Sequence, residues 1–389
     1  MNKLNRQKGF TLVELMISIV LGLLITAAAI QLFITGQTSL SMQQSMADIQ
    51  DNGNFGLNYI ATDIRQSNLG ALSPVSDDQT MYGGIILAPA NLSNFVTIPA
   101  TLMSRSSGQT VGTGNQWTGK SNVTTTAGGA LGSDQLTIQY RPTQNVIPLN
   151  VLTKTTLTTA EAKLINETVI GTDCEGVGIT LNELREGVFI VQRYFLRTDT
   201  TTGADAGLAL ACAASRYTQT EVEANKKKVE AGTTPAPKPI ELKNTSDNPY
   251  TARTDIQRPD LGGAGQVIMR RVDHLHYLFG ISSGSFDSPT NWRYITLRDY
   301  LALTPTNKAD GTANPRPRIR SVQLGMVVRA SDSATRTSLI PDQPTFDIFD
   351  QSGSTNGVKV KTSAGSPKYL RQAVTQTIAL RNSMGIDNR

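Results

Sequence analysis

The first part of the chain is apolar at almost every position. From Phe10 to Phe33 the sequence FTLVELMISIVLGLLITAAAIQLF contains one ionisable residue, Glu14, and no proline. An α-helix needs roughly 20 apolar residues to span the hydrocarbon core of a bilayer. This pattern therefore predicts a membrane-spanning helix over residues 10–33.

Beyond this run, apolar residues recur at steps of three or four, which is typical of one face of an α-helix. These positions are Met42, Met46, Ile49, Gly53, Leu57, Ile60 and Ile64, and the polar residues predicted on the opposite face are Gln43, Gln44, Asp48, Gln50, Asp51 and Asn58. Residues 34–70 are therefore predicted to continue the helix as an amphipathic half that packs on a globular head. Gly36, Gly53 and Gly56 each cost about 1 kcal/mol against alanine in a helix, so they are candidates for local bends or melting.

After Gly70 the pattern changes to short alternating runs separated by Gly, Pro, Asn and Asp, which predicts a β-rich head over residues 71–389. The predicted strands cover residues 135–140, 187–199, 206–214, 267–281, 318–331 and 369–382. The second and third of these flank a turn rich in Thr, Gly and Asp, so we expect them to form a hairpin.

Two stretches between the predicted strands have the composition of loop inserts. Residues 101–133 are rich in Ser, Thr and Gly, while residues 216–265 contain Lys226–Lys228 and the sequence TTPAPKP. Both are predicted to be exposed loops, and the second is expected to be either disordered or a binding arm.

The basic residues give the N-terminal helix a direction. The formal net charge of the chain is +5, and it falls to +2 without Lys3, Arg6 and Lys8, which is too small to indicate nucleic-acid binding from charge alone. Because these three residues precede the apolar run, the N-terminus is predicted to be cytoplasmic, with the head on the far side of the inner membrane.

The junction between the basic and apolar stretches does not fit a secretory signal peptide, which carries a small-residue cleavage site after its apolar core. Here the basic stretch ends at Lys8-Gly9, directly before the apolar run, and continues as GFTLVE. This junction resembles the class III leader of type IV prepilins. The resemblance implies that prepilin peptidase cuts between Gly9 and Phe10, and that Phe10 becomes the N-methylated first residue of the mature protein.

Glu14 lies inside the predicted membrane span, where a carboxylate costs at least a few kcal/mol and indicates a function. The prepilin resemblance implies an assembly role, in which Glu14 pairs with the N-terminal amine created by cleavage, on a neighbouring subunit or on the same one. An unpaired buried charge is penalised, so such pairing would fix the stagger of the subunits. The alternative is an ordinary membrane anchor that tolerates a Glu near the interface.

Further resemblances lie at the end of the helix and in the head. IATDIRQSNLGA (60–71) resembles the D-I-R-x-A-G ending of PilW-like minor pilins and of J-type minor pseudopilins, with Ser67-Asn68 where Ala-Gly is expected. The last two predicted strands, with the terminal ALRN, and the hairpin resemble PilW-type proteins. The family implies an α+β, type IV pilin-like fold, with a long N-terminal helix packed on a large antiparallel β-rich head.

The resemblance also implies a function that is not enzymatic and uses no cofactor. A PilW-type minor pilin primes type IV pilus assembly with other minor pilins and the major pilin, at or near the tip, where it can hold a tip adhesin. It would contact the inner-membrane assembly platform and support twitching motility, adhesion or DNA uptake, with no nucleic acid directly predicted as a partner. The alternative is a J-type minor pseudopilin of type II secretion, a family whose heads are typically much shorter.

Two short motifs suggest catalysis, but their surroundings do not support it. Residues 114–121, GNQWTGKS, match a phosphate-binding loop but lack the flanking strand and helix that such a loop needs. Residues 280–284, GISSG, match a nucleophile elbow, yet both histidines of the chain precede Ser282, whereas that fold places its histidine after the serine. No catalytic residue is predicted.

His274 and His276 share one face of a predicted strand, but a zinc site needs more donors than lie nearby in sequence. A solvated or hydrogen-bonded strand face is therefore expected, and no metal site is predicted there or at Asp347 and Asp350. The two cysteines, Cys174 and Cys212, would lie in an oxidising compartment, so a disulfide is predicted over two free thiols. Closing a loop of this length would stabilise the fold by about 3–4 kcal/mol.

Overall fold

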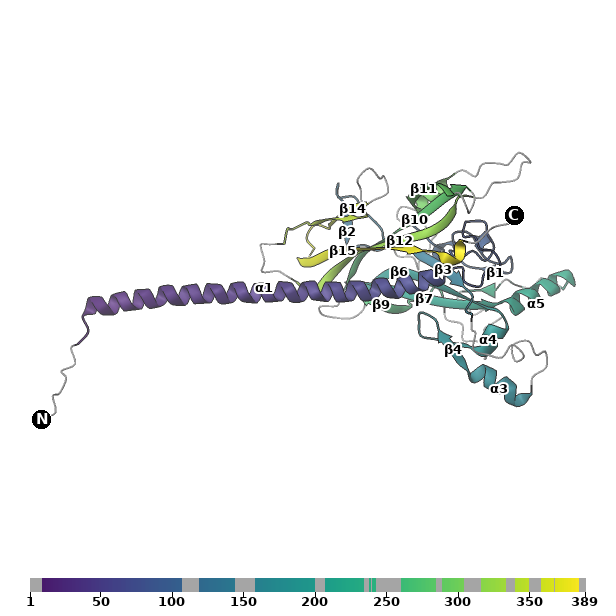
Figure 1. Ribbon diagram of the computed structural model, residues 1–389, viewed down its shortest axis with the longest axis horizontal. Coiled ribbons are helices and arrows are strands. Elements are labelled where there is room, and N and C mark those ends of the chain that lie inside the picture. The colour runs from purple at the N-terminus through teal and green to yellow at the C-terminus, as the bar shows by residue number, and fades with distance from the viewer. Residues whose placement is uncertain are drawn as a thin grey trace.

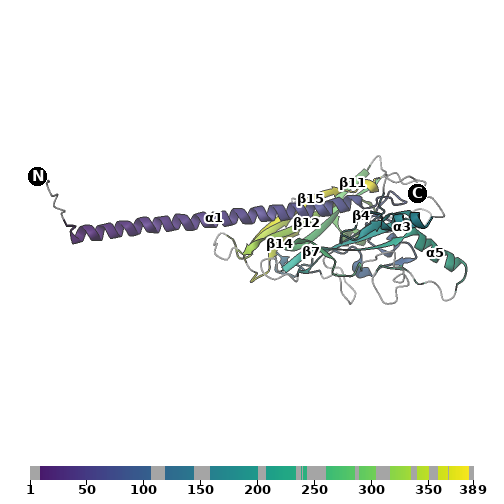
Figure 2. The same cartoon turned by 90° about the horizontal axis from the view of Figure 1, so that it is seen from below.

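A long helix and a β-rich head make up the molecule in the computed structural model (Figures 1 and 2). The structure describes residues 9–106, 119–143, 158–199, 207–233, 238, 240–242, 260–284, 289–303, 316–333, 340–349, 358–366 and 368–384. Helix α1 (Leu12–Gln66) stands clear of the head over its N-terminal part and runs along the head over its C-terminal part in both views. The predicted α+β architecture is confirmed.

Helix α1 has 55 residues and continues through Gly36, Gly53 and Gly56, so the melting considered at these glycines is not found. At 1.5 Å per residue the helix is about 80 Å long. Gly56 serves a different purpose, because a Cβ at this position would collide with the sulfur of Met269 in the head. The glycine lets the helix backbone approach the sheet closely.

The first four-stranded sheet is antiparallel, in the order β3-β6-β7-β9. Its strands are β3 (Leu136–Tyr140), β6 (Val188–Asp199), β7 (Gly207–Thr218) and β9 (Gln266–Arg270). β6 and β7 pair from Val188 opposite Thr218 to Asp199 opposite Gly207, so the predicted hairpin is confirmed.

The second four-stranded sheet is also antiparallel, in the order β11-β10-β12-β15. Its strands are β10 (Val272–Gly284), β11 (Pro289–Thr296), β12 (Arg318–Ser333) and β15 (Tyr369–Ala379). The single strand predicted over 267–281 was wrong, because β9 and β10 divide at Arg271 and belong to different sheets. Arg271 has a φ of 63°, a left-handed conformation that ends an extended strand.

Smaller elements complete the head. A three-stranded sheet of β2 (Val123–Thr125), β14 (Val358–Thr362) and β13 (Thr345–Ile348) packs against the second large sheet. Two strand pairs are β1 (Val96–Thr97) with β8 (Ile240–Glu241) and β4 (Val169–Thr172) with β5 (Gly178–Thr180). The short helices are η1 (Pro89–Asn91), η2 (Ala100–Leu102), α3 (Thr159–Glu167), α4 (Leu181–Arg185), α5 (Gln219–Glu230), α6 (Leu297–Ala302) and η4 (Arg381–Ser383).

The two stretches predicted as exposed loops, residues 101–133 and 216–265, are partly built into the fold. In the first, Leu102 and Val123 are buried in hydrophobic clusters. The second contains the end of β7, helix α5 and strand β8, with Lys226–Lys228 exposed on α5. These elements bury only isolated apolar residues, so they lack the periodic apolar pattern that would have predicted them. Most of TTPAPKP lies outside the described residues.

The main core lies where α1 meets both large sheets. Its buried members come from α1, from the first sheet and from the second sheet, including Ile60, Tyr194 and Leu324. α1 packs against β9, β12 and β15, so the helix covers the seam between the two sheets. One face of the helix therefore packs against both large sheets.

Candidate functional site: the N-terminal helix and its seat on the head

The N-terminal half of α1 is apolar on every side and is not buried against any described part of the head. From Leu12 to Ile34 the large apolar side chains are 53–74% exposed. A helix that is apolar all round requires an apolar environment. This segment is long and apolar enough to cross a membrane.

The predicted processing site lies at the free end of this helix. Gly9 and Phe10 precede α1 and are exposed, and Thr11 caps the helix by accepting a hydrogen bond from the Glu14 backbone N–H at 3.3 Å. The Thr11 hydroxyl also lies 3.4 Å from Glu14 Oε2. Glu14 is thus in the first helical turn, where the helix dipole favours a carboxylate. The roles of Gly9, Phe10 and Glu14 stay predictions.

Thr11 was missed in the sequence, although its signal was present. A Thr three residues before a Glu at the start of an apolar run is the pattern of a capping box. Thr11 follows Phe10 directly, and α1 begins at the next residue, Leu12. The helix therefore places the Glu14 carboxylate about one turn from the predicted new N-terminus.

The predicted apolar stripe contacts the head from Ile49 onward. Ile49, Leu57, Ile60 and Ile64 are buried, whereas Met46 remains 40% exposed. The stripe prediction is therefore confirmed for its C-terminal part, and the seat of the helix begins at Ile49.

Asp48 was predicted on the polar face opposite the apolar stripe, but its side chain contacts the head. Its carboxylate accepts hydrogen bonds from Arg271 Nη2 at 2.8 Å and from the Ser331 backbone N–H at 3.0 Å. One turn later, Asn52 Nδ2 donates to the Arg270 carbonyl at 2.8 Å. Both helix residues therefore bond to the junction at residues 270–271, where the chain passes from β9 of the first sheet to β10 of the second sheet. The error arose because a short polar side chain at the edge of a helix stripe can reach a partner that sequence does not reveal.

A second polar contact joins α1 to the first sheet. The hydroxyl of Tyr194, on β6, donates to Asp63 Oδ2 in a short hydrogen bond, and Tyr194 is fully buried. Burial raises the pKa of Asp63, and the hydrogen bond from Tyr194 opposes this in part. Burial and the nearby Asp63 charge raise the pKa of Tyr194 well above its usual range. The acidic residue of the D-I-R segment is thus a contact between helix and head.

The C-terminal end of α1 is hydrogen-bonded to Asn382, in the short helix η4 that follows β15. Asn382 Nδ2 donates to the carbonyls of Arg65, at 2.9 Å, and Ser67, at 3.2 Å, while Asn68 Nδ2 donates to the Asn382 carbonyl at 2.8 Å. Helix ends leave carbonyls without partners, and Asn382 supplies the missing donor. The ALRN segment therefore has a structural role.

Asn68 also explains the departure from the expected Ala-Gly. Its φ is 64°, in the left-handed region that glycine occupies most readily. Asn is among the residues that tolerate this region best after glycine. Asn68 therefore keeps the turn that a glycine would form, and its side chain also donates a hydrogen bond to the Asn382 carbonyl.

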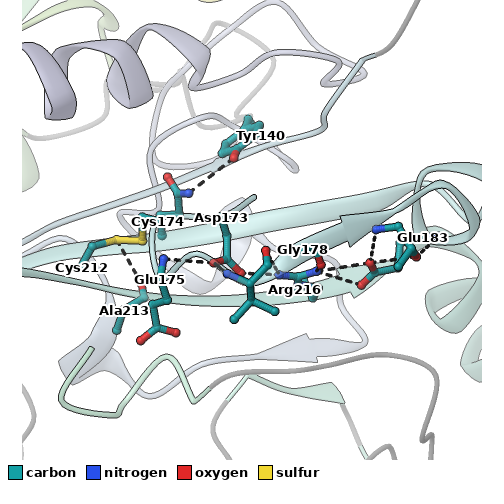
Figure 3. Close-up of polar contacts among 12 residues, drawn as sticks. Tyr140, Asp173, Cys174, Glu175, Gly178, Glu183, Cys212, Ala213 and Arg216 are labelled. Carbon is teal, nitrogen blue, oxygen red and sulfur yellow. Dashed lines mark hydrogen bonds and ion pairs between the residues drawn. A yellow bond between two sulfur atoms is a disulfide. The ribbon is translucent and has the colours of Figure 1, made fainter. Parts of the chain in front are cut away.

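The predicted disulfide is confirmed, and it lies beside a buried ion-pair network (Figure 3). Cys174 bonds to Cys212 of β7 with Cα atoms 6.1 Å apart. Arg216, also on β7, pairs with Asp173 and, at 3.1 Å, with Glu183, and all three side chains are almost fully buried. The disulfide and Arg216 together fasten the α3–β4–β5–α4 segment to the first sheet.

The histidines face the interior of the head. His274 is 1% and His276 is 4% exposed, so the strand face is hydrogen-bonded but not solvated. His276 Nδ1 lies 2.6 Å from Asp134 Oδ2, and His274 Nδ1 lies 3.0 Å from the Ser121 hydroxyl. Burial, chiefly, lowers the pKa of His274 to about 3. Among the described residues no group of three or more His, Cys, Asp or Glu side chains is placed to hold a metal ion.

The other candidate motifs are part of the fold or lie partly outside the described residues. Ser282 is buried within β10, which continues to Gly284, so GISSG is part of a strand. Of GNQWTGKS, only residues 119–121 are described, and Lys120 Nζ donates to the Thr198 hydroxyl at 2.6 Å. Asp347 forms an exposed ion pair with Lys359, whereas Asp350 lies outside the described residues.

Two family models match the chain, one at its N-terminus and one over the C-terminal part of the head. Residues 4–30 match the model of the prokaryotic N-terminal methylation motif, which contains Gly9, Phe10 and Glu14. Residues 242–382 match the model of the type IV pilus-assembly protein W family, a range that includes β9 to β15 and Asn382. Searches of curated proteins and of solved structures return no match. The chain therefore carries a prokaryotic N-terminal methylation motif, and its C-terminal region is similar to the type IV pilus-assembly protein W family.

Proposed function

We propose that this protein is a minor pilin that takes part in priming type IV pilus assembly with other minor pilins, at or near the pilus tip. The two family matches support a structural component of a pilus. The observation that carries the proposal is the bare apolar half of α1, which begins next to the predicted cleavage site and carries Glu14 in its first turn. Such a helix needs neighbours that the single chain does not supply.

The proposed mechanism is assembly through charge pairing. Prepilin peptidase cuts after Gly9, and Phe10 then carries a methylated amine that keeps its positive charge. Glu14 pairs with such an amine on a neighbouring subunit or on its own, since an unpaired carboxylate in an apolar environment is costly. When neighbouring subunits have the correct stagger, Glu14 meets the amine, and an incorrect stagger leaves its charge unpaired.

The length of α1 fits this arrangement. With residues 10–33 in the inner membrane and the helix in contact with the head from Asp48, residues 34–47 form a connecting stretch of roughly 20 Å. The head would then lie in the periplasm, above the bilayer, before incorporation into the pilus. The exposed connecting stretch is available to the helices of other minor pilins and of the major pilin. The assembly platform, a tip adhesin, twitching motility, adhesion and DNA uptake belong to the same proposal.

The experiment that tests the proposal compares Glu14→Ala with Ser18→Ala in a piliated host. Ser18 is the matched control, because it lies one turn away and its hydroxyl donates to the Glu14 backbone carbonyl, at 2.7 Å, and not to the carboxylate. Glu14→Ala should be cleaved normally but fall at least about tenfold in sheared pili, since pairing of a membrane-buried carboxylate involves a few kcal/mol. Ser18→Ala should be incorporated like the parent.

Processing is measured on the same samples. N-terminal sequencing should find Phe10 as the first residue in the parent and both variants, while Gly9→Leu should leave a precursor of higher mass. Filaments that contain Glu14→Ala at the parental level would contradict the charge-pairing role. Normal processing of Gly9→Leu would contradict the cleavage site.

A further inference from the structure

The first half of β10 is covered by a segment that is distant from it in sequence. β11 pairs with β10 from Leu278 onward, and before this residue the segment 121–134, called here the covering segment, lies along β10 instead. The Asp134 N–H donates to the Leu275 carbonyl at 2.9 Å, and the Asp134 carboxylate accepts from the Tyr277 N–H at 2.8 Å. The covering segment therefore takes the place that β11 occupies further along the strand.

Two histidines of β10 contact the covering segment through one nitrogen each. His274 Nδ1 lies 3.0 Å from the Ser121 hydroxyl and 3.3 Å from the Ser133 hydroxyl, so it is within hydrogen-bond reach of both ends of the segment. His276 Nδ1 lies 2.6 Å from Asp134 Oδ2. The other nitrogen of each ring, Nε2, is buried and has no hydrogen-bond partner in the described part of the chain.

This site accommodates a second proton poorly. His274 is 1% and His276 is 4% exposed, and their ring centres are 6.3 Å apart. Both nitrogens of an imidazolium are donors, and a buried N–H without an acceptor is costly. Burial and the neighbouring His276 lower the pKa of His274 to about 3, and the Asp134 carboxylate opposes this shift. The closed site therefore keeps His274 neutral.

The charge balance at this site depends chiefly on Asp134. Asp273, the residue before His274, is already bonded, since it accepts from Arg371 Nε at 2.6 Å and from Asn122 Nδ2 at 2.8 Å. The other charged residues on the described elements around the pair are Lys120, Arg329, Asp347, Lys359 and Lys361. Arg329 lies beside Asp273, and Asp347 pairs with Lys359 at the surface. The charges that act on His274 are those of His276 and Asp134.

We propose that His274 and His276 make the covering segment sensitive to acid, so that it detaches from β10 in mildly acidic surroundings. The open form binds protons that the closed form excludes. An exposed histidine has a pKa of about 6.5, so the stability of the closed form is full above this pH and is lost as the pH falls toward the lowered pKa of His274. The proposal does not depend on cleavage after Gly9, on Glu14 or on a role in a pilus.

The first test follows the protons directly in the untagged full chain in detergent micelles. Because the sequence contains two histidines, selective carbon-13 labelling of histidine gives one ring signal for each. The variant His274→Gln identifies the signal of His274. In the closed parent we expect this signal to stay at its neutral position from pH 7.5 to 5. Titration of His274 near pH 6.5 in the closed chain would overturn the proposal.

The second test measures opening by hydrogen exchange on peptides that cover residues 121–134 and 272–277, corrected for the direct effect of pH on exchange. Opening of both peptides should rise at least about tenfold from pH 7.5 to 5 in the parent. Peptides from β6, which contains no histidine, should not change. His274→Gln should abolish the rise, because glutamine does not titrate in this range. Asp134→Asn is the comparison and should keep it, since the proton acts at the imidazole and not at the carboxylate.

Three results of the exchange measurement would contradict the acid response of the histidine pair. These are equal opening of the parent at both pH values, a rise that persists in His274→Gln, or a rise that vanishes in Asp134→Asn. Near-ultraviolet circular dichroism at pH 7.5 checks that each variant is folded. If His274→Gln fails this check, the ring titration of the parent decides, because its two signals can also be assigned with His276→Gln.

Discussion

The two halves of α1 differ in what stabilises them. Between Leu12 and Ile34 the large apolar side chains are exposed, and the described part of the head does not bury them. From Ile49 to Ile64 a narrow stripe is buried, and Asp48, Asn52 and Asp63 add polar contacts at its borders. One continuous helix thus consists of an exposed apolar segment and a segment that packs on its own head.

The largest expected effect comes from matched truncations in the two halves. Ile60→Ala should lower the free energy of unfolding of the head by about 2–5 kcal/mol, because Ile60 is fully buried between the sheets. Ile25→Ala should change it by less than about 0.5 kcal/mol, since the Ile25 side chain is 71% exposed. Chemical unfolding of the full chain in detergent, followed by near-ultraviolet circular dichroism, measures both. Equal effects would contradict the division at Ile49.

A smaller effect is expected at the border of the seat. Asp48→Ala should cost about 1–3 kcal/mol, because it removes the acceptor for Arg271 and for the Ser331 N–H. Asp51→Ala is the control, since Asp51 is exposed on the same helix. The same unfolding measurement applies. If both variants lose the same stability, the contact between α1 and the seam does not stabilise the seat.

The smallest effect is a change in pH dependence. The pKa of Asp63 is raised in the folded state, so the folded chain binds the proton more tightly than the unfolded chain does. The stability from this protonation is full below the ordinary carboxyl pKa of about 4 and is lost as pH rises through the raised value. Asp63→Asn should remove this fall in stability, whereas Asp51→Asn should not.

Stability is measured at several pH values for the parent and both variants. A parental slope retained in Asp63→Asn would show that Asp63 titrates alike in the folded and unfolded chains. The contact between Asp63 and Tyr194 would then make no contribution to the pH dependence of the free energy of unfolding.

Periodic features could be predicted from the sequence, and single contacts could not. The stripe from Ile49 to Ile64 and the β6–β7 hairpin repeat a pattern over many residues, so their signal accumulates. The division at Arg271 depends on one backbone conformation, and arginine gives no local sign of it. Asp48 was misplaced for a related reason, since its partners lie 223 and 283 residues away in the chain.

The candidate site divides in the same way. Gly9, Phe10 and Glu14 came from a short contiguous motif, and the family match to residues 4–30 covers them. The disulfide between Cys174 and Cys212 was predictable because the chain has only two cysteines. The buried Arg216 network was not predictable, because its acidic partners are ordinary residues until the fold brings them together.

The reciprocal bonds between the end of α1 and Asn382 span 317 residues of chain. Strand β15, which packs against α1, is synthesised long after the helix because it lies near the other end of the described chain. The C-terminal half of the helix therefore lacks this packing partner until synthesis has reached β15.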